Sequence, residues 1–337
     1  MATASKSTVR RMTIMDAIIV GAGQSGLATA YYLHKAGIEF VMLDAHERAG
    51  GMWPNTWPSL TLFSPADASN LPGKFMPSYP GFPPASHVAE YLRDYEERYG
   101  FDILRPVHVD HVTHNGQLFT VHAGTRMWKS PAVVAATGTW NAPFVPYYPG
   151  SFAGTQWHAR TYPGPSQFQG TKVAVVGGHD SGAQIAADLL NAGVETQWYT
   201  RREPRWLPDD VDGRVLFQRS RAQILGTSAP QRQFEGDIVM VPPVLKARDE
   251  GRLRARPMFE SLDEIDAQHL VWATGFRPAL KPFRHLLNKN SQPLVEGLHL
   301  VGYGNWTGPA SATLAGVGPF AKKAAAEIAG RHRKTYA

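Results

Sequence analysis

A glycine-rich turn near the start of the chain is the first group of residues that could do chemistry. Residues 21–26 read Gly-Ala-Gly-Gln-Ser-Gly and fit the pattern G-x-G-x-x-G. In this pattern the first glycine permits a tight turn, the second lets the backbone approach a pyrophosphate, and the third lets helix and strand pack closely. Asp44 follows at the end of the next expected strand, where a carboxylate can accept hydrogen bonds from ribose hydroxyls and would repel a 2′-phosphate. We therefore predict that FAD or NAD binds here, in contact with Gly21, Gly23, Gln24, Ser25, Gly26 and Asp44.

A second, imperfect copy of this turn lies at residues 177–182, which read Gly-Gly-His-Asp-Ser-Gly. His179 stands where the middle glycine would be, so either the turn is relaxed or a nucleotide lies farther out. Arg201 and Arg202 stand where the first copy has its acid, and a guanidinium group suits a 2′-phosphate. The alternative is a pair of surface arginines after a strand. We predict NADPH at this second turn, with NADH as an alternative, bound by Gly177, Ser181, Gly182, Arg201 and Arg202.

Each turn must be positioned by a strand before it and by a helix and a second strand after it. The first unit has a β-branched run at 14–20, good helix formers at 27–35 and a strand pattern at 40–43; the second repeats this order at 172–176, 183–190 and 195–200. A glycine turn in this strand–helix–strand context is typical of a dinucleotide-binding unit. The sequence therefore predicts an α/β fold with two Rossmann-like domains.

Other segments complete this arrangement. Strands expected at 132–136 and 269–273 both run into Ala-Thr-Gly, and a last strand at 298–302 precedes a helix expected at 316–328. The stretch 203–256 is rich in proline and charge, and we expect it to be an irregular insertion with little sheet of its own.

The composition restricts the chemistry. The chain has 337 residues, 43% of them hydrophobic and 18% charged, which is typical of a globular protein. It has no cysteine, so this chain can form no disulfide framework, thiolate metal site, cysteine nucleophile or redox-active dithiol. No cluster of metal ligands stands out either, and any electrons must be carried by a bound cofactor. The net charge of +6 is small for this length and does not indicate a nucleic-acid partner. No apolar run approaches the roughly 20 residues that span a membrane, so we expect a cytoplasmic protein.

A linker motif lies between the two units. Residues 152–162 read Phe-Ala-Gly-Thr-Gln-Trp-His-Ala-Arg-Thr-Tyr and fit F-x-G-x-x-x-H-x-x-x-Y. With the two glycine turns, the Ala-Thr-Gly endings and the run Trp-Ala-Thr-Gly-Phe-Arg-Pro at 272–278, the chain resembles the flavin-containing monooxygenases over roughly residues 14–330. The short length and the runs at 209–217 and 236–245 are similar to a bacterial subgroup in which some members accept either NADH or NADPH.

The resemblance implies a glutathione-reductase-like FAD/NAD(P)-binding architecture. FAD would occupy the first unit and NADPH the second. The FAD domain would be discontinuous, at 12–165 and 271–337, and the NAD(P)H domain would span 166–270 with the insertion 203–256. The resemblance also leaves a homodimer open.

The resemblance further implies a reaction. NADPH would reduce the flavin, O2 would add to it, and the resulting C4a-(hydro)peroxyflavin would oxygenate a small soft nucleophile such as a thioether (sulfoxidation) or an amine. Baeyer–Villiger members usually end the linker motif in Trp, whereas this chain has Tyr162, which favours heteroatom oxidation. Ketone oxidation, an NAD(P)H oxidase or diaphorase, and a nucleotide-binding redox sensor remain alternatives. A disulfide reductase needs a cysteine pair that this chain lacks.

Several residues gain roles from the resemblance alone. Asn70 is a candidate catalytic residue beside the peroxide, although residues 62–65 could align there instead and Asn70 could simply be a turn residue before Pro72. His158 is a second catalytic candidate, and a packed linker histidine is the simpler interpretation. Further cofactor contacts are implied for Trp53, Thr137, Gly138, Thr274, Gly275 and Asn305.

Overall fold

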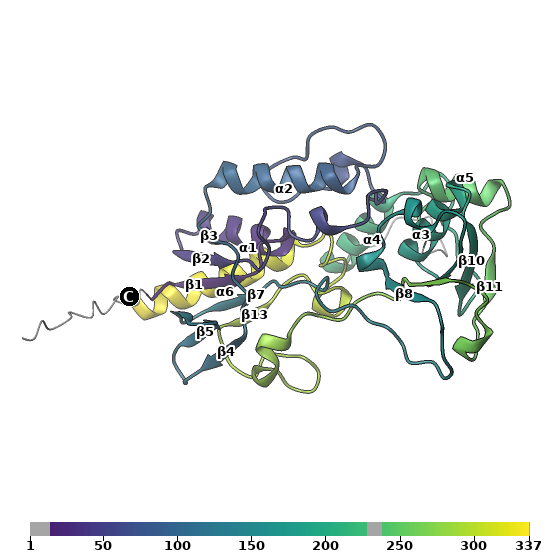
Figure 1. Cartoon of the computed structure of the whole chain (residues 1–337). Coiled ribbons are helices and arrows are strands. Elements are labelled where there is room, and N and C mark those ends of the chain that lie inside the picture. The colour runs from purple at the N-terminus through teal and green to yellow at the C-terminus, as the bar shows by residue number, and fades with distance from the viewer. Residues whose placement is uncertain (1–13, 228–237, 337) are drawn as a thin grey trace, which may run out of the picture.

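The computed structural model describes residues 14–227 and 238–336. Two parallel five-stranded sheets form two lobes (Figure 1). The first sheet has the order β13-β7-β1-β2-β3 and the second has the order β11-β10-β9-β12-β8. The first consists of β1 (Ala17–Val20), β2 (Phe40–Leu43), β3 (Ile103–Leu104), β7 (Val133–Ala135) and β13 (Leu298–Leu300). The second consists of β8 (Thr155–His158), β9 (Lys172–Val176), β10 (Glu195–Thr200), β11 (Ala255–Pro257) and β12 (His269–Trp272). The predicted α/β fold with two dinucleotide-binding units is confirmed.

Helices cover one face of the first sheet. The glycine turn after β1 leads into α1 (Gln24–Lys35), which packs against α6 (Gly318–Tyr336), and α2 (Ala85–Tyr99) adds to the same apolar cluster. The opposite face packs against a small antiparallel sheet of β4 (His111–His114), β5 (Phe119–Ala123) and β6 (Arg126–Ser130). The β1 strand is buried on both faces, which explains its continuous apolar run.

The second sheet is built in the same way. Its glycine turn leads from β9 into α3 (Asp180–Asn191), which packs against α5 (Pro242–Asp249). Trp57, from the segment after β2 in the first unit, is buried in the apolar cluster of this second unit. The segment that follows β2 therefore contacts both units.

The stretch 203–256 is more regular than the sequence suggested. It contains α4 (Gly213–Leu225) and α5, and β11 begins at Ala255; residues 228–237, including the start of the run at 236–245, lie outside the described residues. Its prolines were expected to break structure, but Pro242 and Pro243 open α5, where a missing N–H costs nothing. Asp212 caps α4 by accepting a hydrogen bond from the Arg214 amide at 2.8 Å.

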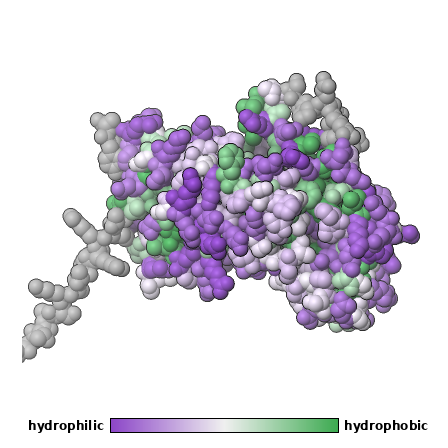
Figure 2. Space-filling model, turned by 90° about the horizontal axis from the view of Figure 1, so that it is seen from above, coloured by the Kyte–Doolittle hydropathy of each residue, from purple (hydrophilic) through white to green (hydrophobic). Residues whose placement is uncertain are grey.

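Hydrophilic residues cover most of the face seen from above, with hydrophobic residues scattered over it in small groups (Figure 2). Within the described residues, no helix is both long and apolar enough to cross a membrane. Residues 12, 13 and 337, at the ends of the expected FAD domain, lie outside the described part of the chain.

Candidate cofactor and substrate site

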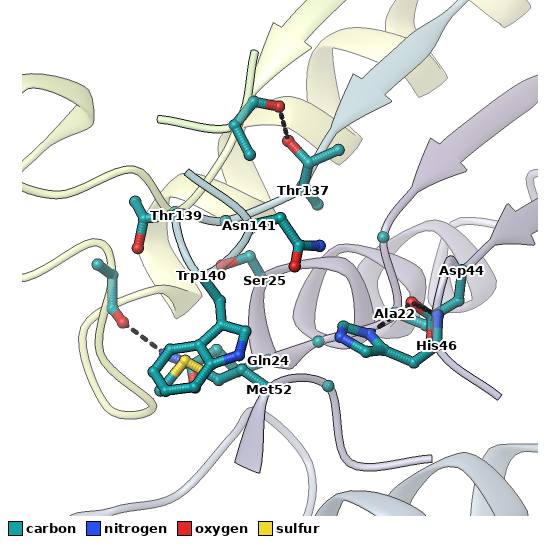
Figure 3. Close-up of a pocket in the computed structure, with 18 of the residues that line it drawn as sticks. Ala22, Gln24, Ser25, Asp44, His46, Met52, Thr137, Thr139, Trp140 and Asn141 are labelled. Atoms are coloured by element: carbon teal, nitrogen blue, oxygen red, sulfur yellow. Dashed lines mark hydrogen bonds and ion pairs between the residues drawn. The ribbon is translucent and has the colours of Figure 1, made fainter. Parts of the chain in front are cut away.

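A cavity of about 620 Å³ lies where β1, β2 and β7 end. This is the edge of a parallel sheet at which nucleotides bind in open α/β folds, and the volume is in the range of cofactor sites. The lining includes most of the residues predicted to contact FAD: Gly21, Gly23, Gln24, Ser25, Asp44, Trp53, Thr137 and Gly138. Asp44 and His46 lie on one side of this cavity, and Gln24, Met52 and Trp140 lie on another (Figure 3).

The glycines of the first turn serve two different purposes. A Cβ on Gly21 would lie 2.4 Å from the Ala136 carbonyl oxygen, and one on Gly26 would lie 1.9 Å from the Gly21 carbonyl oxygen, so the fold itself requires both. At Gly23 the nearest heavy atom in the described part of the chain would be the Gly51 Cα, 3.9 Å away. The fold therefore does not need glycine at position 23, but a ligand that approaches the backbone there does.

The start of α1 supplies donors for an anion. Gly23 is the N-cap and offers no capping side chain, and the first turn carries no acidic residue. The first N–H groups of a helix have no partner within the helix, and the helix dipole favours negative charge there. Together with the open side of Gly23, this arrangement fits the pyrophosphate of a dinucleotide.

Asp44 is held in its charged form beside the cavity. Its side chain is only 4% exposed, and it accepts a hydrogen bond from Arg105 Nε at 2.8 Å and lies 3.3 Å from His46 Nδ1. Burial alone would raise the pKa of Asp44, but the contacts with His46 and Arg105 outweigh burial and hold its pKa below its usual value. Arg105 is itself bonded to both carboxylate oxygens of Glu96, at 2.6 and 2.8 Å. Because a carboxylate has about four acceptor positions, Asp44 keeps capacity for ribose hydroxyls.

Trp53 and Gln24 connect three segments around the cavity. Trp53 Nε1 donates to Gln24 Oε1 at 3.2 Å, and Gln24 Nε2 donates to the Ala312 carbonyl oxygen. These bonds join the loop after β2, the start of α1 and the loop before α6. Asn305, in contrast, is exposed and does not line the cavity; its Oδ1 accepts the Ala310 amide at 3.2 Å. Gly302 and residues 312–314 of the same loop line the cavity in its place.

Thr137 is fixed by a tyrosine that the sequence did not single out. The Thr137 hydroxyl donates to the Ala279 carbonyl oxygen at 2.9 Å and lies 2.7 Å from the Tyr303 hydroxyl, which also accepts the Thr137 amide at 3.1 Å. Burial raises the pKa of Tyr303 well above its ordinary value, so the phenol stays protonated. It can therefore donate to Thr137 and hold the Ala-Thr-Gly ending against the cavity.

The second glycine turn has the same backbone requirements as the first. A Cβ on Gly177 would lie 2.3 Å from the Ala273 carbonyl oxygen, and one on Gly182 would lie 2.0 Å from the Gly177 carbonyl oxygen. His179 is the N-cap of α3 in extended conformation, and its side chain is exposed. Substituting His179 for the middle glycine has therefore left the turn intact. Ser181 is half-buried in the first turn of α3.

Arg201 and Arg202 follow directly on β10, and both side chains are exposed. β10 pairs with β9 as β2 pairs with β1, so the two arginines stand at the position that Asp44 has in the first unit. The large cavity does not extend to them. The two units thus present opposite charges at equivalent positions.

His158 is the last residue of β8, the edge strand by which the chain connects the first unit to the second sheet, and it does not line the cavity. Its Nδ1 accepts the Arg160 amide at 3.0 Å, and its Nε2 donates to the Gly275 carbonyl oxygen at 3.1 Å. Thr274 is tied to the same connection, because its hydroxyl donates to the Phe144 carbonyl oxygen at 2.5 Å. Both ring nitrogens of His158 are thus engaged by backbone, which favours the packed linker histidine over a catalytic role.

Replacing His158 with Gln is expected to change how stability depends on pH. Burial lowers the pKa of His158 below its ordinary value, although its bond to Gly275 opposes this. A histidine whose folded-state pKa is lowered costs nothing above its unfolded pKa, and it destabilises the fold as the pH falls below about 6.5. The free energy of unfolding by which wild type exceeds His158→Gln should therefore decrease from pH 7 to pH 5. The decrease is at most ~1.4 kcal/mol per pH unit, because one proton is involved. Urea unfolding at several pH values measures this, with the exposed His285→Gln as the matched control. A difference that does not change with pH would contradict this expectation.

Asn70 does not line the cavity. Its Nδ2 donates to the Asp67 carbonyl oxygen and its Oδ1 accepts the Met76 amide, both at 2.6 Å. Both polar atoms are thus used to shape its own loop, as expected of a turn residue. The alternative segment lies closer, because Leu62, Phe63 and Ser64 line the cavity.

Two buried serines place their hydroxyl groups in the lining of the cavity, which Asn70 does not reach. Ser64 and Ser69 both line the cavity, and their oxygens are 2.8 Å apart. Ser69 also lies 2.8 Å from the Pro65 carbonyl oxygen, which can only accept. When Ser69 donates to Pro65, Ser64 must donate to Ser69; when Ser69 donates to Ser64, the Ser64 proton is free to point into the cavity.

Comparisons with known proteins agree with this geometry. A family model described as pyridine nucleotide-disulphide oxidoreductase matches residues 18–296. The chain is 40% identical to a flavin-containing monooxygenase from Stenotrophomonas maltophilia, with a TM-score of 0.84 over 95% of this chain and 99% of that one. It is 28% identical over 333 residues to an uncharacterized oxidoreductase, CzcO-like, from Geobacillus kaustophilus (strain HTA426), covering 90% of this chain and 95% of the relative. A structure of OTEMO in complex with FAD and NADP shares the fold, at 15% identity and a TM-score of 0.65 over 96% of this chain and 87% of that one.

Proposed function

The chain belongs to the pyridine nucleotide-disulphide oxidoreductase family and is a flavin-dependent monooxygenase, and from this premise we propose that it uses NADPH and O2 to oxygenate small soft nucleophiles such as thioethers or amines. The observation that carries the proposal is the difference between its two equivalent glycine turns. Asp44 follows the first and Arg201 and Arg202 follow the second. An acid selects a ribose without a 2′-phosphate, and arginines select a ribose that carries one. One chain thus offers separate sites for FAD and for NADPH.

The residues at the first turn fit FAD. The α1 N-terminus would bind its pyrophosphate, Asp44 would accept hydrogen bonds from its ribose, and the segments with Thr137, Gly302 and Trp53 would enclose the remainder. When bound, FAD supplies the redox chemistry that passes electrons from the nicotinamide to O2. The chain has to position the cofactors, exclude water from the site and stabilise developing charge. NADH would serve as a weaker alternative donor, because the interactions other than those of the arginines do not depend on the 2′-phosphate.

The part of the cavity lining formed by Leu62, Phe63 and Ser64 suits a soft substrate. It presents apolar groups and one hydroxyl. Ser64 would serve there as a hydrogen-bond donor when Ser69 donates to Ser64 in place of the Pro65 carbonyl oxygen, because the Ser64 proton is then free to point into the cavity. A thioether or a tertiary amine needs no strong hydrogen-bond partner to enter such a site.

Product analysis with labelled oxygen tests the proposed function. The holoenzyme is supplied with NADPH and ¹⁸O2 and with one substrate at a time: a methyl thioether, a tertiary amine or a cyclic ketone. We expect a sulfoxide or N-oxide that carries one ¹⁸O, formed as NADPH is consumed. A labelled lactone as the main product would assign ketone oxidation instead. NADPH consumption that yields only hydrogen peroxide with all three substrates would make the protein an oxidase.

A further inference from the structure

Two phenylalanines from different units meet in the lining of the cavity. Phe63 belongs to the loop of the first unit, and Phe217 belongs to α4, which lies between β10 and β11 of the second. Their ring centroids are 6.1 Å apart and their planes are inclined by 45°. This separation is within the range of favourable aromatic pairs. We call Phe63 and Phe217 the aromatic wall.

Backbone contacts fix α4 in this position. The Gly213 amide donates to the Phe63 carbonyl oxygen at 2.7 Å. A Cβ on Gly213 would lie 2.7 Å from the Phe63 ring and 2.8 Å from Ser64 Cβ, so the helix approaches the loop as closely as a glycine allows. Asp212 caps the helix at this same point. The position of Phe217 is therefore set by the loop that carries Phe63.

The aromatic wall lies at the substrate end of the cavity. A dinucleotide with a ribose on Asp44 and its pyrophosphate on the α1 N-terminus directs its other end away from Asp44. In the proposed function that other end faces the second unit, because NADPH would bind there. Of the described residues that line the cavity, Phe217 alone comes from the second unit, and it thus marks this end. Among the described lining residues, the loop at 62–69 and α4 contribute no charged side chain.

We propose that Phe63 and Phe217 determine substrate specificity by selecting aryl thioethers over small alkyl thioethers. This inference rests on the proposed function and names the substrate class for the same site. A flat ring can pack against both phenylalanines in offset or edge-to-face geometry, whereas a small alkyl group gains only contact area. The uncharged surroundings also disfavour substrates with a permanently ionised group, which would lose hydration without gaining a partner.

The test measures binding and turnover separately, with Phe217→Ala and Phe217→Leu. Calorimetric titration of the FAD-loaded protein with methyl phenyl sulfone and with dimethyl sulfone gives the binding selectivity without any reaction. We expect both variants to bind the aryl sulfone about 10-fold more weakly than wild type and the dimethyl sulfone unchanged. In steady-state assays, KM for methyl phenyl sulfide should rise with little change in kcat. Leu225→Ala, at the exposed end of the same helix, is the matched control and should leave all values unchanged.

The outcomes separate this inference from the proposed function. If the Phe217 variants lost aryl and alkyl binding equally, or lost neither, the proposed role of the aromatic wall in substrate selection would be wrong. Circular dichroism and FAD content of each variant distinguish such a result from unfolding, and Phe63→Ala provides a second variant with the same expected change in binding selectivity. A wild-type protein that oxygenates neither a thioether nor an amine would refute the proposed function, whereas the sulfone titrations would still decide whether the aromatic wall selects aryl groups.

Discussion

Gly23→Ala is expected to fold like the wild-type protein and to bind FAD about 10- to 100-fold more weakly. The alanine Cβ would find its nearest described neighbour, Gly51 Cα, 3.9 Å away, which is ordinary van der Waals contact, and Gly23 has a φ of −80° that any residue can adopt. The added methyl group therefore costs the apoprotein little. It would occupy the space through which the pyrophosphate approaches the α1 N-terminus, and overpacking of this kind typically costs about 1–3 kcal/mol.

Titration of the apoprotein with FAD, followed by flavin fluorescence, gives the affinity, and thermal unfolding of the apoprotein gives the stability. Gly330→Ala is the control, because the residue lies in α6 and a Cβ there meets no described atom within 4 Å beyond its chain neighbours and the backbone of its own helix. Gly26→Ala should behave differently from both, since its Cβ would lie 1.9 Å from the Gly21 carbonyl oxygen and must disturb the fold itself. Unchanged FAD affinity in Gly23→Ala would mean that the dinucleotide does not cross this turn.

Replacing Arg201 and Arg202 together with Ala is expected to lower kcat/KM for NADPH about 10- to 100-fold and to leave kcat/KM for NADH nearly unchanged. A guanidinium makes charge-assisted hydrogen bonds to a 2′-phosphate, and NADH has none to lose. The effect should diminish at high salt because both side chains are exposed.

Steady-state kinetics with both nucleotides, at two ionic strengths, measures this change. Arg333→Ala, an exposed arginine on α6, is the control and should alter neither value. A double variant in which the two specificity constants fall by the same factor would show that the arginines do not contact the 2′-phosphate.

The sequence was sufficient for features that depend on neighbours in the chain. The strand, glycine turn and helix of each unit follow from local propensity and from steric demands within six residues, as the close approach of Gly26 to the Gly21 carbonyl oxygen shows. Asp44 could be placed because it ends the strand that follows the same helix. The helix after the first turn starts at Gln24, three residues before its run of strong helix formers, because the turn residues themselves form its first turn.

Features that depend on distant partners could not be predicted in this way. Arg105 and Tyr303 lie far along the chain from Asp44 and Thr137, and only the fold brings each pair into contact. A buried acid such as Asp44 does require a cation, but nothing local shows which one. Asn70 and Ser64 were both compatible with the cavity until the hydrogen bonds of the loop turned Asn70 toward Asp67 and Met76. Phe217 lies in a stretch expected to be irregular, so its place in the cavity had no sequence signal.

Anaerobic reduction followed by admission of oxygen tests the central proposal most directly. The purified protein, loaded with FAD, is titrated with NADPH in the absence of O2, and a methyl thioether is then added together with O2. We expect the flavin absorption to bleach with one equivalent of NADPH and to return with O2, while about one equivalent of sulfoxide forms per NADPH. A protein that takes up no FAD, or a flavin whose absorption does not bleach with NADPH, would contradict it.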